Sequence, residues 1–125
     1  ESFDRTLQYL RERKQFGVLI GSFQALQHRS ADWWSEIELC KSIVLKGLQA
    51  MDEGDAKLSV LASIAKAKLC EVAELATNEA IQMHAGIGMT DEYEIGFFIK
   101  RARPAQMMFG DYSYHNDRFA RLSGY

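Results

Sequence analysis

The sequence is poor in proline and cysteine and contains no long apolar run, and each absence excludes a class of protein. Only one proline is present, and no segment is of low complexity, so we expect a single domain over residues 1–125 without an internal linker. A membrane-spanning helix needs about 20 consecutive apolar residues, a length that no run in this chain approaches. The sequence therefore predicts a soluble globular protein.

The two cysteines, Cys40 and Cys70, lie far apart inside helical patterns. This arrangement is neither a disulfide framework nor a zinc site, and it is typical of a reducing compartment. We interpret both residues as small buried hydrophobic groups. His28, His84 and His115 also lack the spacing of metal ligands, so no metal site is predicted. His84 lies at a helix end, where it can donate a hydrogen bond to a ligand or bond to the backbone.

Acidic and basic residues nearly balance, and the formal net charge is -2. This balance gives no general attraction to nucleic acid or to an anionic membrane, and no nucleic-acid recognition motif is present. The sequence shows no signal or transit peptide, which predicts a protein that is not secreted. No Ser-His-Asp or Cys-His arrangement indicates nucleophilic catalysis.

Apolar residues recur at steps of three and four along most of the chain, which predicts an all-α fold. The predicted helices cover residues 3 to about 17, 23–51, 56–84, a stretch that begins near Asp91, and a short last helix over 112–121. The second and third helices are long and are joined by a short turn, so they are expected to form an antiparallel pair. These features predict an antiparallel helical bundle with a short C-terminal helix.

Local residue types predict where these helices begin and end. We expect Ser22 to cap the second helix, Gly54 to end it, and Asp55 to cap the third. Pro104 is expected to end or kink the fourth helix, because proline lacks a backbone N–H and disfavours helical geometry at the residue before it.

The segment 80–90 ends the third helix and contains two closely spaced glycines, Gly86 and Gly88. Glycine adopts positive φ at little cost, so both positions are expected to permit a sharp turn and a close approach of a ligand to the backbone. Asp91 and Glu94 follow with the spacing of a capping box, which is expected to start the fourth helix. For the glycine pair alone, an ordinary helix–turn–helix corner is the alternative.

Two basic clusters lie near predicted helix ends: Arg11, Arg13 and Lys14, and then Lys100, Arg101 and Arg103. An arginine in the first cluster can clamp a phosphate with two hydrogen bonds. Alternatively, cations at the C-terminal end of a helix stay solvated and interact favourably with its dipole. The second cluster has the same alternative, a solvated face with a local salt bridge. The residue pattern leaves these interpretations open.

Four stretches in a fixed order resemble the C-terminal domain of the acyl-CoA dehydrogenases. They are Tyr-Leu-Arg-Glu-Arg-Lys-Gln-Phe-Gly at 9–17, Phe-Gln-Ala-Leu-Gln at 23–27, Ala-Ile-Gln-Met-His-Ala-Gly-Ile-Gly-Met-Thr-Asp-Glu-Tyr at 80–93, and Lys-Arg at 100–101. The resemblance covers essentially the whole chain and implies a four-helix bundle. It implies that the chain, which starts at Glu1 rather than Met, is a fragment cut within the first helix of a longer three-domain protein.

The resemblance also implies what the longer protein does. Members of this family bind FAD between subunits and are mostly homotetramers, arranged as dimers of dimers. They desaturate an acyl-CoA thioester between Cα and Cβ with FAD as hydride acceptor, and they pass electrons to an electron-transfer flavoprotein. We therefore expect an oxidoreductase of fatty acid metabolism in the bacterial cytoplasm or the mitochondrial matrix. The fragment alone is expected to be inactive, because the other domains complete the flavin and acyl sites.

By position, the resemblance implies five cofactor-binding residues: Arg13, Phe16, Gln24, Gln82 and Gly86. Arg13 matches the arginine that reaches the FAD diphosphate of the neighbouring subunit, and Phe16 matches an aromatic residue near the adenosine half. Gln24 matches a glutamine that also contacts this cofactor. Gln82 and Gly86 match residues that line its adenine and ribose. A guanidinium suits a phosphate, and an amide suits the polar edges of a base or ribose. A glycine lets a ligand approach the backbone closely.

The catalytic glutamate of the family has no counterpart in this sequence. The stretch Met-Phe-Gly-Asp-Tyr at 108–112 replaces the usual Tyr-Glu-Gly-Thr, so Phe109 or Gly110 takes the place of the glutamate, and neither can act as a base. Three explanations are open: a base on an earlier helix outside this chain, Asp111 in a shifted loop, or a non-catalytic subunit of a heteromer. We favour the first or the third, because a slip of one residue changes where a turn side chain points.

A helical oligomerisation module without chemistry is the alternative function. Its aromatic residues are then expected to be buried against a second copy: Trp33, Trp34, Phe97 and Phe98. The two functions differ in Arg13 and Gln82, which face a cleft between subunits in a cofactor half-site and stay solvated in a plain bundle. A related flavin enzyme such as an acyl-CoA oxidase is a close enzymatic alternative.

Overall fold

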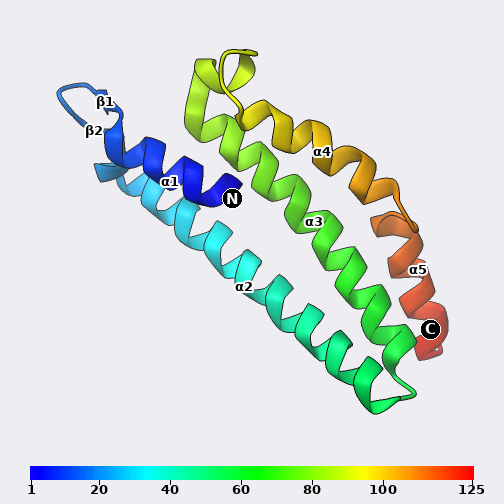
Figure 1. The fold of residues 1–125 in the computed structure, drawn as a ribbon. Coiled ribbons are helices and arrows are strands. Elements are labelled where there is room, and N and C mark those ends of the chain that lie inside the picture. Colours follow the sequence, from blue (N-terminus) through cyan, green and yellow to red (C-terminus); the bar gives the residue numbers. More distant parts are fainter.

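The computed structural model describes all 125 residues and consists mainly of five α-helices (Figure 1). The helices are α1 (Ser2–Glu12), α2 (Gln24–Glu53), α3 (Leu58–His84), α4 (Ile95–Met107) and α5 (Tyr112–Ser123). A short antiparallel hairpin pairs β1 (Lys14–Gln15) with β2 (Val18–Leu19), and two 3₁₀ turns, η1 and η2, cover Ile20–Ser22 and Ala85–Met89. The predicted all-α bundle with a short C-terminal helix is confirmed.

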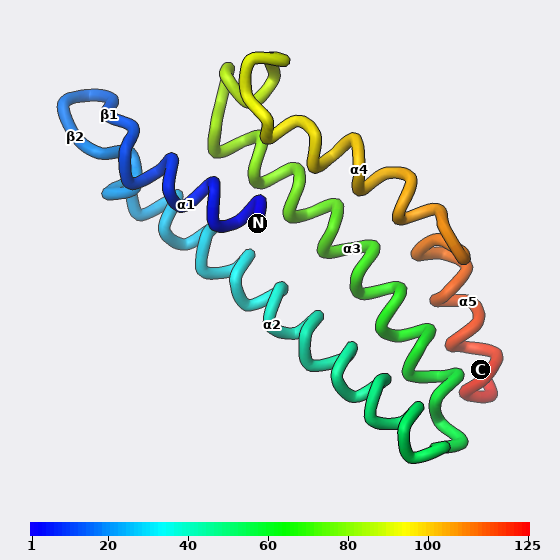
Figure 2. Tube along the Cα trace, in the orientation of Figure 1, coloured from blue at the N-terminus to red at the C-terminus, as the bar shows by residue number.

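The helix α3 lies at the centre of the bundle. The helix α2 runs antiparallel to it on one side, and α4 followed by α5 covers the other side (Figures 1 and 2). The helix α1 is much shorter and lies only beside the half of the α2–α3 pair that is nearer to the hairpin (Figure 1). This arrangement brings the end of α1, the hairpin, the start of α2 and the end of α3 together at one end of the molecule.

The core at this end of the bundle is built from seven buried residues: Phe3, Leu10, Ile20, Trp33, Ala80, Met83 and Ile95. The Phe3 ring meets the Trp33 indole edge-on, with 4.9 Å between the ring centroids. Trp33 is almost fully buried, whereas 46% of Trp34 is exposed, so only the first of the two tryptophans is a core residue. Both cysteines are free and buried, which confirms their interpretation as small hydrophobic groups.

The turn between α2 and α3 follows one prediction and departs from another. Gly54 ends α2 with φ +66°, as expected of a glycine C-cap. The prediction that Asp55 caps α3 is wrong, because Lys57 holds that position and α3 begins at Leu58. The Asp55 carboxylate instead accepts a hydrogen bond from the Lys57 backbone N–H, at 2.8 Å, and so forms a local turn before the helix.

The first helix ends earlier than expected, and an antiparallel hairpin takes the place of its predicted last residues. The helix α1 ends at Glu12, and the hairpin that follows turns at Phe16 and Gly17, which have φ +53° and φ +80°. Ser22 does not cap α2, because its hydroxyl donates to the carbonyl oxygen of Leu19 within the 3₁₀ turn. Phe23 is the N-cap residue of α2 and makes no side-chain hydrogen bond there.

The boundaries of α4 also differ from the prediction. The helix starts at Ile95 rather than near Asp91, and its N-cap residue Glu94 forms no side-chain cap. The predicted capping box is therefore wrong: the Asp91 carboxylate pairs with Lys100 at 3.4 Å instead. Pro104 lies inside α4, which continues to Met107. Pro104 therefore does not end the helix, although it supplies no backbone N–H to the preceding turn, and α4 stops three residues after it.

Candidate functional site

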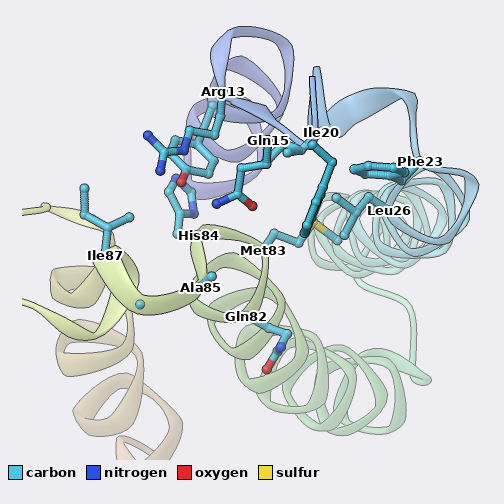
Figure 3. A pocket seen from close by; sticks show the side chains of 13 residues that line it. Arg13, Gln15, Ile20, Phe23, Leu26, Gln82, Met83, His84, Ala85 and Ile87 are labelled. Atoms are coloured by element: carbon cyan, nitrogen blue, oxygen red, sulfur yellow. The ribbon is translucent and has the colours of Figure 1, made fainter. Parts of the chain in front are cut away.

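A cavity of about 450 Å³ lies where the end of α1, the hairpin, the start of α2 and the end of α3 meet (Figure 3). Four of the five residues predicted to bind a cofactor line it: Arg13, Phe16, Gln82 and Gly86. The fifth, Gln24, is exposed at the first position of α2, beside the lining residue Phe23, and does not line the cavity. Residues more than sixty positions apart in the sequence thus share one site.

The side chains around the cavity point in different directions (Figure 3). Arg13 and Gln15 project from the segment after α1 into the space above α3, whereas Gln82 points away from both of them (Figure 3). Gln15 also lines the cavity, although neither the residue pattern nor the family resemblance indicated it. Its position in the two-residue strand β1 gave no periodic signal that would have identified it.

Arg13 is the C-cap residue of α1 and has extended backbone angles, which turn the chain away from the helix axis. Its backbone N–H bonds to the carbonyl oxygen of Tyr9 at 2.9 Å. Arg13 takes part in none of the ion pairs of the chain. A guanidinium without a carboxylate partner, at the wall of a cavity, is available to an anionic ligand.

Phe16 occupies the tip of the hairpin and is 91% exposed. Its backbone is in the left-handed region, with φ +53°, which is uncommon for a large non-glycine residue. The ring stands edge-on to that of Phe23, at 6.4 Å between centroids. An exposed aromatic ring on such a turn offers a flat apolar surface at the mouth of the cavity.

The turn after α3 does not use the two glycines as predicted. Ala85 carries the positive φ, +54°, whereas neither Gly86 nor Gly88 has a positive φ. Gly88 is needed for packing, because a Cβ there would lie 2.8 Å from the carbonyl oxygen of Ile81. At Gly86 a Cβ would meet no atom within 4 Å, so its backbone is open to an approaching ligand. The expectation of a close backbone approach therefore applies to Gly86 alone.

His84 lies at the wall of the cavity and is 1% exposed. Its Nδ1 atom is 2.7 Å from the carbonyl oxygen of Ala80, a contact that requires Nδ1 to carry the proton. Tyr9 stacks on the ring at 4.3 Å, and Tyr93 lies against it at 4.9 Å. Burial lowers the pKa of His84 below its ordinary value, which favours the neutral ring. In the neutral ring with the proton on Nδ1, Nε2 is an acceptor, and it is buried here without a partner.

The corner between α4 and α5 lies outside the cavity. Phe109 is 86% exposed with φ +60°, and Gly110 has φ +97°. The Asp111 carboxylate accepts the backbone N–H of Tyr114 at 2.8 Å and so caps α5. His115 fixes the corner from inside, with Nε2 2.9 Å from the carbonyl oxygen of Phe109. None of the three positions considered for a catalytic base presents an uncommitted carboxylate.

The second basic cluster lies on the exposed side of α4. Lys100 pairs with Asp91 at 3.4 Å, and Arg103 pairs with Glu74 at 3.7 Å. All four side chains are more than half exposed, so these pairs contribute little to stability. This arrangement favours the interpretation of a solvated face with local salt bridges.

Comparison with known proteins identifies the family. The family described as "Acyl-CoA dehydrogenase, C-terminal domain" matches residues 1–122. The chain belongs to this family. Its acyl-CoA dehydrogenase domain is 35% identical, over 107 residues, to acyl-CoA dehydrogenase IpdE2 of Mycolicibacterium smegmatis, a match that covers 86% of this chain and 32% of the relative. The chain thus spans about a third of the length of such relatives.

Solved structures support the same fold for this acyl-CoA dehydrogenase domain. Butyryl-CoA dehydrogenase from Megasphaera elsdenii superimposes with a TM-score of 0.93 at 27% identity, covering 99% of this chain and 32% of that one. A chain in a structure described as the electron transferring flavoprotein of Acidaminococcus fermentans gives 0.92 at 30% identity, covering 97% and 32%. None of the helices in the domain combines the length and apolar character that crossing a membrane requires.

Proposed function

We propose that this domain supplies half of an FAD site in a longer, three-domain acyl-CoA dehydrogenase. That protein desaturates an acyl-CoA thioester between Cα and Cβ, and the isolated domain is inactive. The observation that carries the proposal is the cavity that Arg13, Phe16, Gln82 and Gly86 line together from two stretches of the chain, 13–16 and 82–86. Solved relatives described as FAD complexes share the fold at TM-scores of 0.91 and 0.92.

The residues present fit FAD. The unpaired guanidinium of Arg13 suits a diphosphate, and the open backbone at Gly86 lets a ribose or base approach closely. The exposed ring of Phe16 offers a stacking surface for the adenosine half. Gln82 lines the cavity and Gln24 is exposed beside it, so the amides of both can bond to polar edges of the same ligand. When bound, FAD supplies the hydride acceptor for desaturation.

The base that removes the α-proton is proposed to come from outside this chain. Phe109 and Gly110 have no titratable side chain, and the Asp111 carboxylate already caps α5. A carboxylate that leaves its cap leaves backbone N–H groups of the helix unpaired, which costs about 1 kcal/mol. An earlier helix of the longer protein, or the catalytic subunit of a heteromer, is a better source for this group.

The proposed partners follow from the family. The longer protein takes an acyl-CoA substrate and passes electrons to an electron-transfer flavoprotein. It assembles as a dimer of dimers or as a heteromer and works in the bacterial cytoplasm or the mitochondrial matrix. The similarity to a chain in the structure described as the electron transferring flavoprotein of Acidaminococcus fermentans supports the electron acceptor.

A second candidate function, an oligomerisation module without chemistry, is favoured by a different surface. An almost wholly apolar groove of about 380 Å³ runs between α2 and α3 beyond the reach of α1. Ile37, Val44, Leu69 and Val72 line it, and further apolar side chains of α2 are exposed near its end: Leu45, Leu48 and Met51. In this function the groove, and not Arg13, is the essential feature.

The test uses the full-length protein that contains this domain. We expect it to carry FAD, and we expect the flavin absorbance to bleach on addition of an acyl-CoA from a panel of thioesters. The variant Arg13→Gln should weaken flavin binding about 10- to 100-fold, because hydrogen bonds to charged groups contribute about 1.5–3 kcal/mol. The matched control Arg11→Gln removes an exposed charge that does not line the cavity, and it should bind like the unsubstituted protein.

Each other result has a defined meaning. Bound flavin that no acyl-CoA bleaches indicates a catalytically silent subunit that awaits a partner. An Arg13→Gln variant that binds FAD as tightly as Arg11→Gln contradicts the assignment of Arg13. A protein that binds no flavin and assembles through the α2–α3 groove supports the oligomerisation module instead.

A further inference from the structure

An amine and a thiol meet on the side of α3 that packs against α4, away from the cavity. The Nζ atom of Lys66 lies 3.2 Å from the Sγ atom of Cys70, one helical turn further along. The same Nζ donates to the carbonyl oxygens of Ala105 and Gln106, at 2.9 Å and 3.1 Å. These three contacts hold the amine beside the sulfur in a fixed position.

The thiol is enclosed but is not sealed off. Cys70 is 3% exposed, and its Sγ lies 3.6 Å from the carbonyl oxygen of Gln106. The Gln106 amide donates in turn to the carbonyl oxygen of Cys70 at 2.8 Å, which fixes the end of α4 to this turn of α3. Cys70 lines a cavity of about 320 Å³, together with residues that include Glu74 and Tyr112, and this cavity is large enough to admit a small oxidant.

We propose that Lys66 and Cys70 form a reversible redox cross-link, an S–N bond between the two side chains. Hydrogen peroxide first oxidises the thiol to a sulfenic acid, and one water is released. The neutral Lys66 amine then attacks the sulfur; the S–N bond forms, the S–O bond breaks, and the hydroxyl leaves with an amine proton as a second water. The pair loses two hydrogens in all. Condensation of a sulfenic acid with a nitrogen nucleophile is known chemistry of cysteine.

The other cysteine lacks the same partner. Cys40 comes from α2 and contacts the opposite side of α3, where its Sγ lies 3.9 Å from the carbonyl oxygen of Lys68. The Lys68 amine is held by the carboxylates of Glu36 and Glu71. Burial raises the pKa of the Cys40 thiol, which disfavours the reactive thiolate. Cys40 therefore serves as a matched control within the same chain.

The cross-link changes how α4 ends. It removes the positive charge of Lys66 and leaves one N–H on the nitrogen, so the carbonyl oxygens of Ala105 and Gln106 compete for a single donor. Charged donors make the stronger hydrogen bonds, so the last turn of α4 loses part of its attachment to α3. The corner that contains Phe109 follows directly and is expected to loosen.

The experiment treats the purified chain with hydrogen peroxide at about pH 9, where a larger share of lysine amines is neutral than at pH 7. Intact mass and tryptic mapping without reductant are then compared before and after dithiothreitol. We expect a product lighter by two hydrogens, no tryptic cleavage after Lys66, and a covalent link from Lys66 to Cys70 that the reductant reverses. Hydrogen exchange should become faster at 105–110 in the linked form.

Two variants and the unsubstituted chain decide the outcome. Cys40→Ser should form the link as before. Lys66→Arg keeps a cationic donor for the α4 carbonyl oxygens but has no nucleophilic amine, so its Cys70 should gain oxygen instead of losing hydrogen. The proposal is overturned if Cys70 of the unsubstituted chain stays reduced, gains only oxygen or joins another cysteine, or if Lys66→Arg still loses two hydrogens. Because the test needs no flavin, it is independent of the proposed FAD site.

Discussion

Substitution of Gly88 by alanine tests the packing of the turn after α3. A Cβ at this position would lie 2.8 Å from the carbonyl oxygen of Ile81 and 3.0 Å from the Cβ of His84. Both neighbours belong to α3 and cannot rotate away, so the 3₁₀ turn or the end of the helix has to shift. Overpacking of this kind costs about 1–3 kcal/mol. With an unfolding entropy of about 2 cal/mol/K per residue, Tm should fall by about 4–12 °C.

The assay is thermal unfolding followed by far-ultraviolet circular dichroism, with Gly86→Ala as the matched control. Both glycines lie in the same 3₁₀ turn and neither has a positive φ, but a Cβ added at Gly86 would have no atom within 4 Å. Gly86→Ala should therefore be neutral or stabilise the fold by about 0.4–1 kcal/mol, because alanine restricts the unfolded chain. Equal Tm values for the two variants would refute the steric argument for Gly88.

Two further predictions concern a buried histidine and a helix cap. Burial lowers the pKa of His84 below its ordinary value of 6.5, so as pH falls the imidazole is protonated in the unfolded chain before it is protonated in the folded chain. The contribution of the neutral His84 to the free energy of unfolding is therefore complete above pH 6.5 and is lost as pH falls toward the folded-state pKa. The free energy of unfolding in urea should fall more between about pH 7.5 and about pH 5 for the unsubstituted chain than for His84→Phe. Equal decreases in the two proteins would contradict this assignment. Asp111→Ala should lower stability by about 1 kcal/mol in thermal unfolding, whereas Asp111→Asn, which can still cap α5, should stay close to the unsubstituted chain. An equal loss in both variants would show that the carboxylate charge matters rather than the cap.

The long helices were predictable because their apolar residues repeat over many turns. The second helix was expected over 23–51 and covers Gln24–Glu53, and the third was expected over 56–84 and covers Leu58–His84. A repeat of this length outweighs local preferences, and the errors are confined to the ends. The hairpin at β1 and β2 escaped prediction because strands of two residues are too short to show any alternation.

The local rules failed where contacts distant in sequence compete with them. Asp91 and Glu94 have the spacing of a capping box, but Lys100 pairs with Asp91 and Arg5 of α1 pairs with Glu94. The positive φ after α3 falls on Ala85, a residue that sequence rules do not select for such an angle. At the predicted capping box, ion pairs with other parts of the chain, and not the spacing of the two acidic residues, determine where the carboxylates bond.

Part of the candidate site was accessible to sequence analysis, and part was not. Resemblance to the family selected Arg13, Phe16, Gln82 and Gly86, which line one cavity, and it also selected Gln24, which lies beside that cavity. The unpaired Nε2 of His84 could not have been inferred, because the tautomer depends on a carbonyl oxygen one helical turn earlier and on the burial of the ring between two tyrosines.

The central position of α3 has a consequence for how the molecule opens and closes. Because α1, α2, α4 and α5 all pack against this helix, its middle turns lose their cover only when the whole bundle comes apart. Amide hydrogens there are expected to exchange with solvent mainly through global unfolding. The tip of the hairpin, where Phe16 is 91% exposed, buries little surface against the bundle, and its amide hydrogens are expected to exchange sooner. The middle of the bundle is thus expected to be its most protected part, whereas one rim of the cavity belongs to the exposed hairpin.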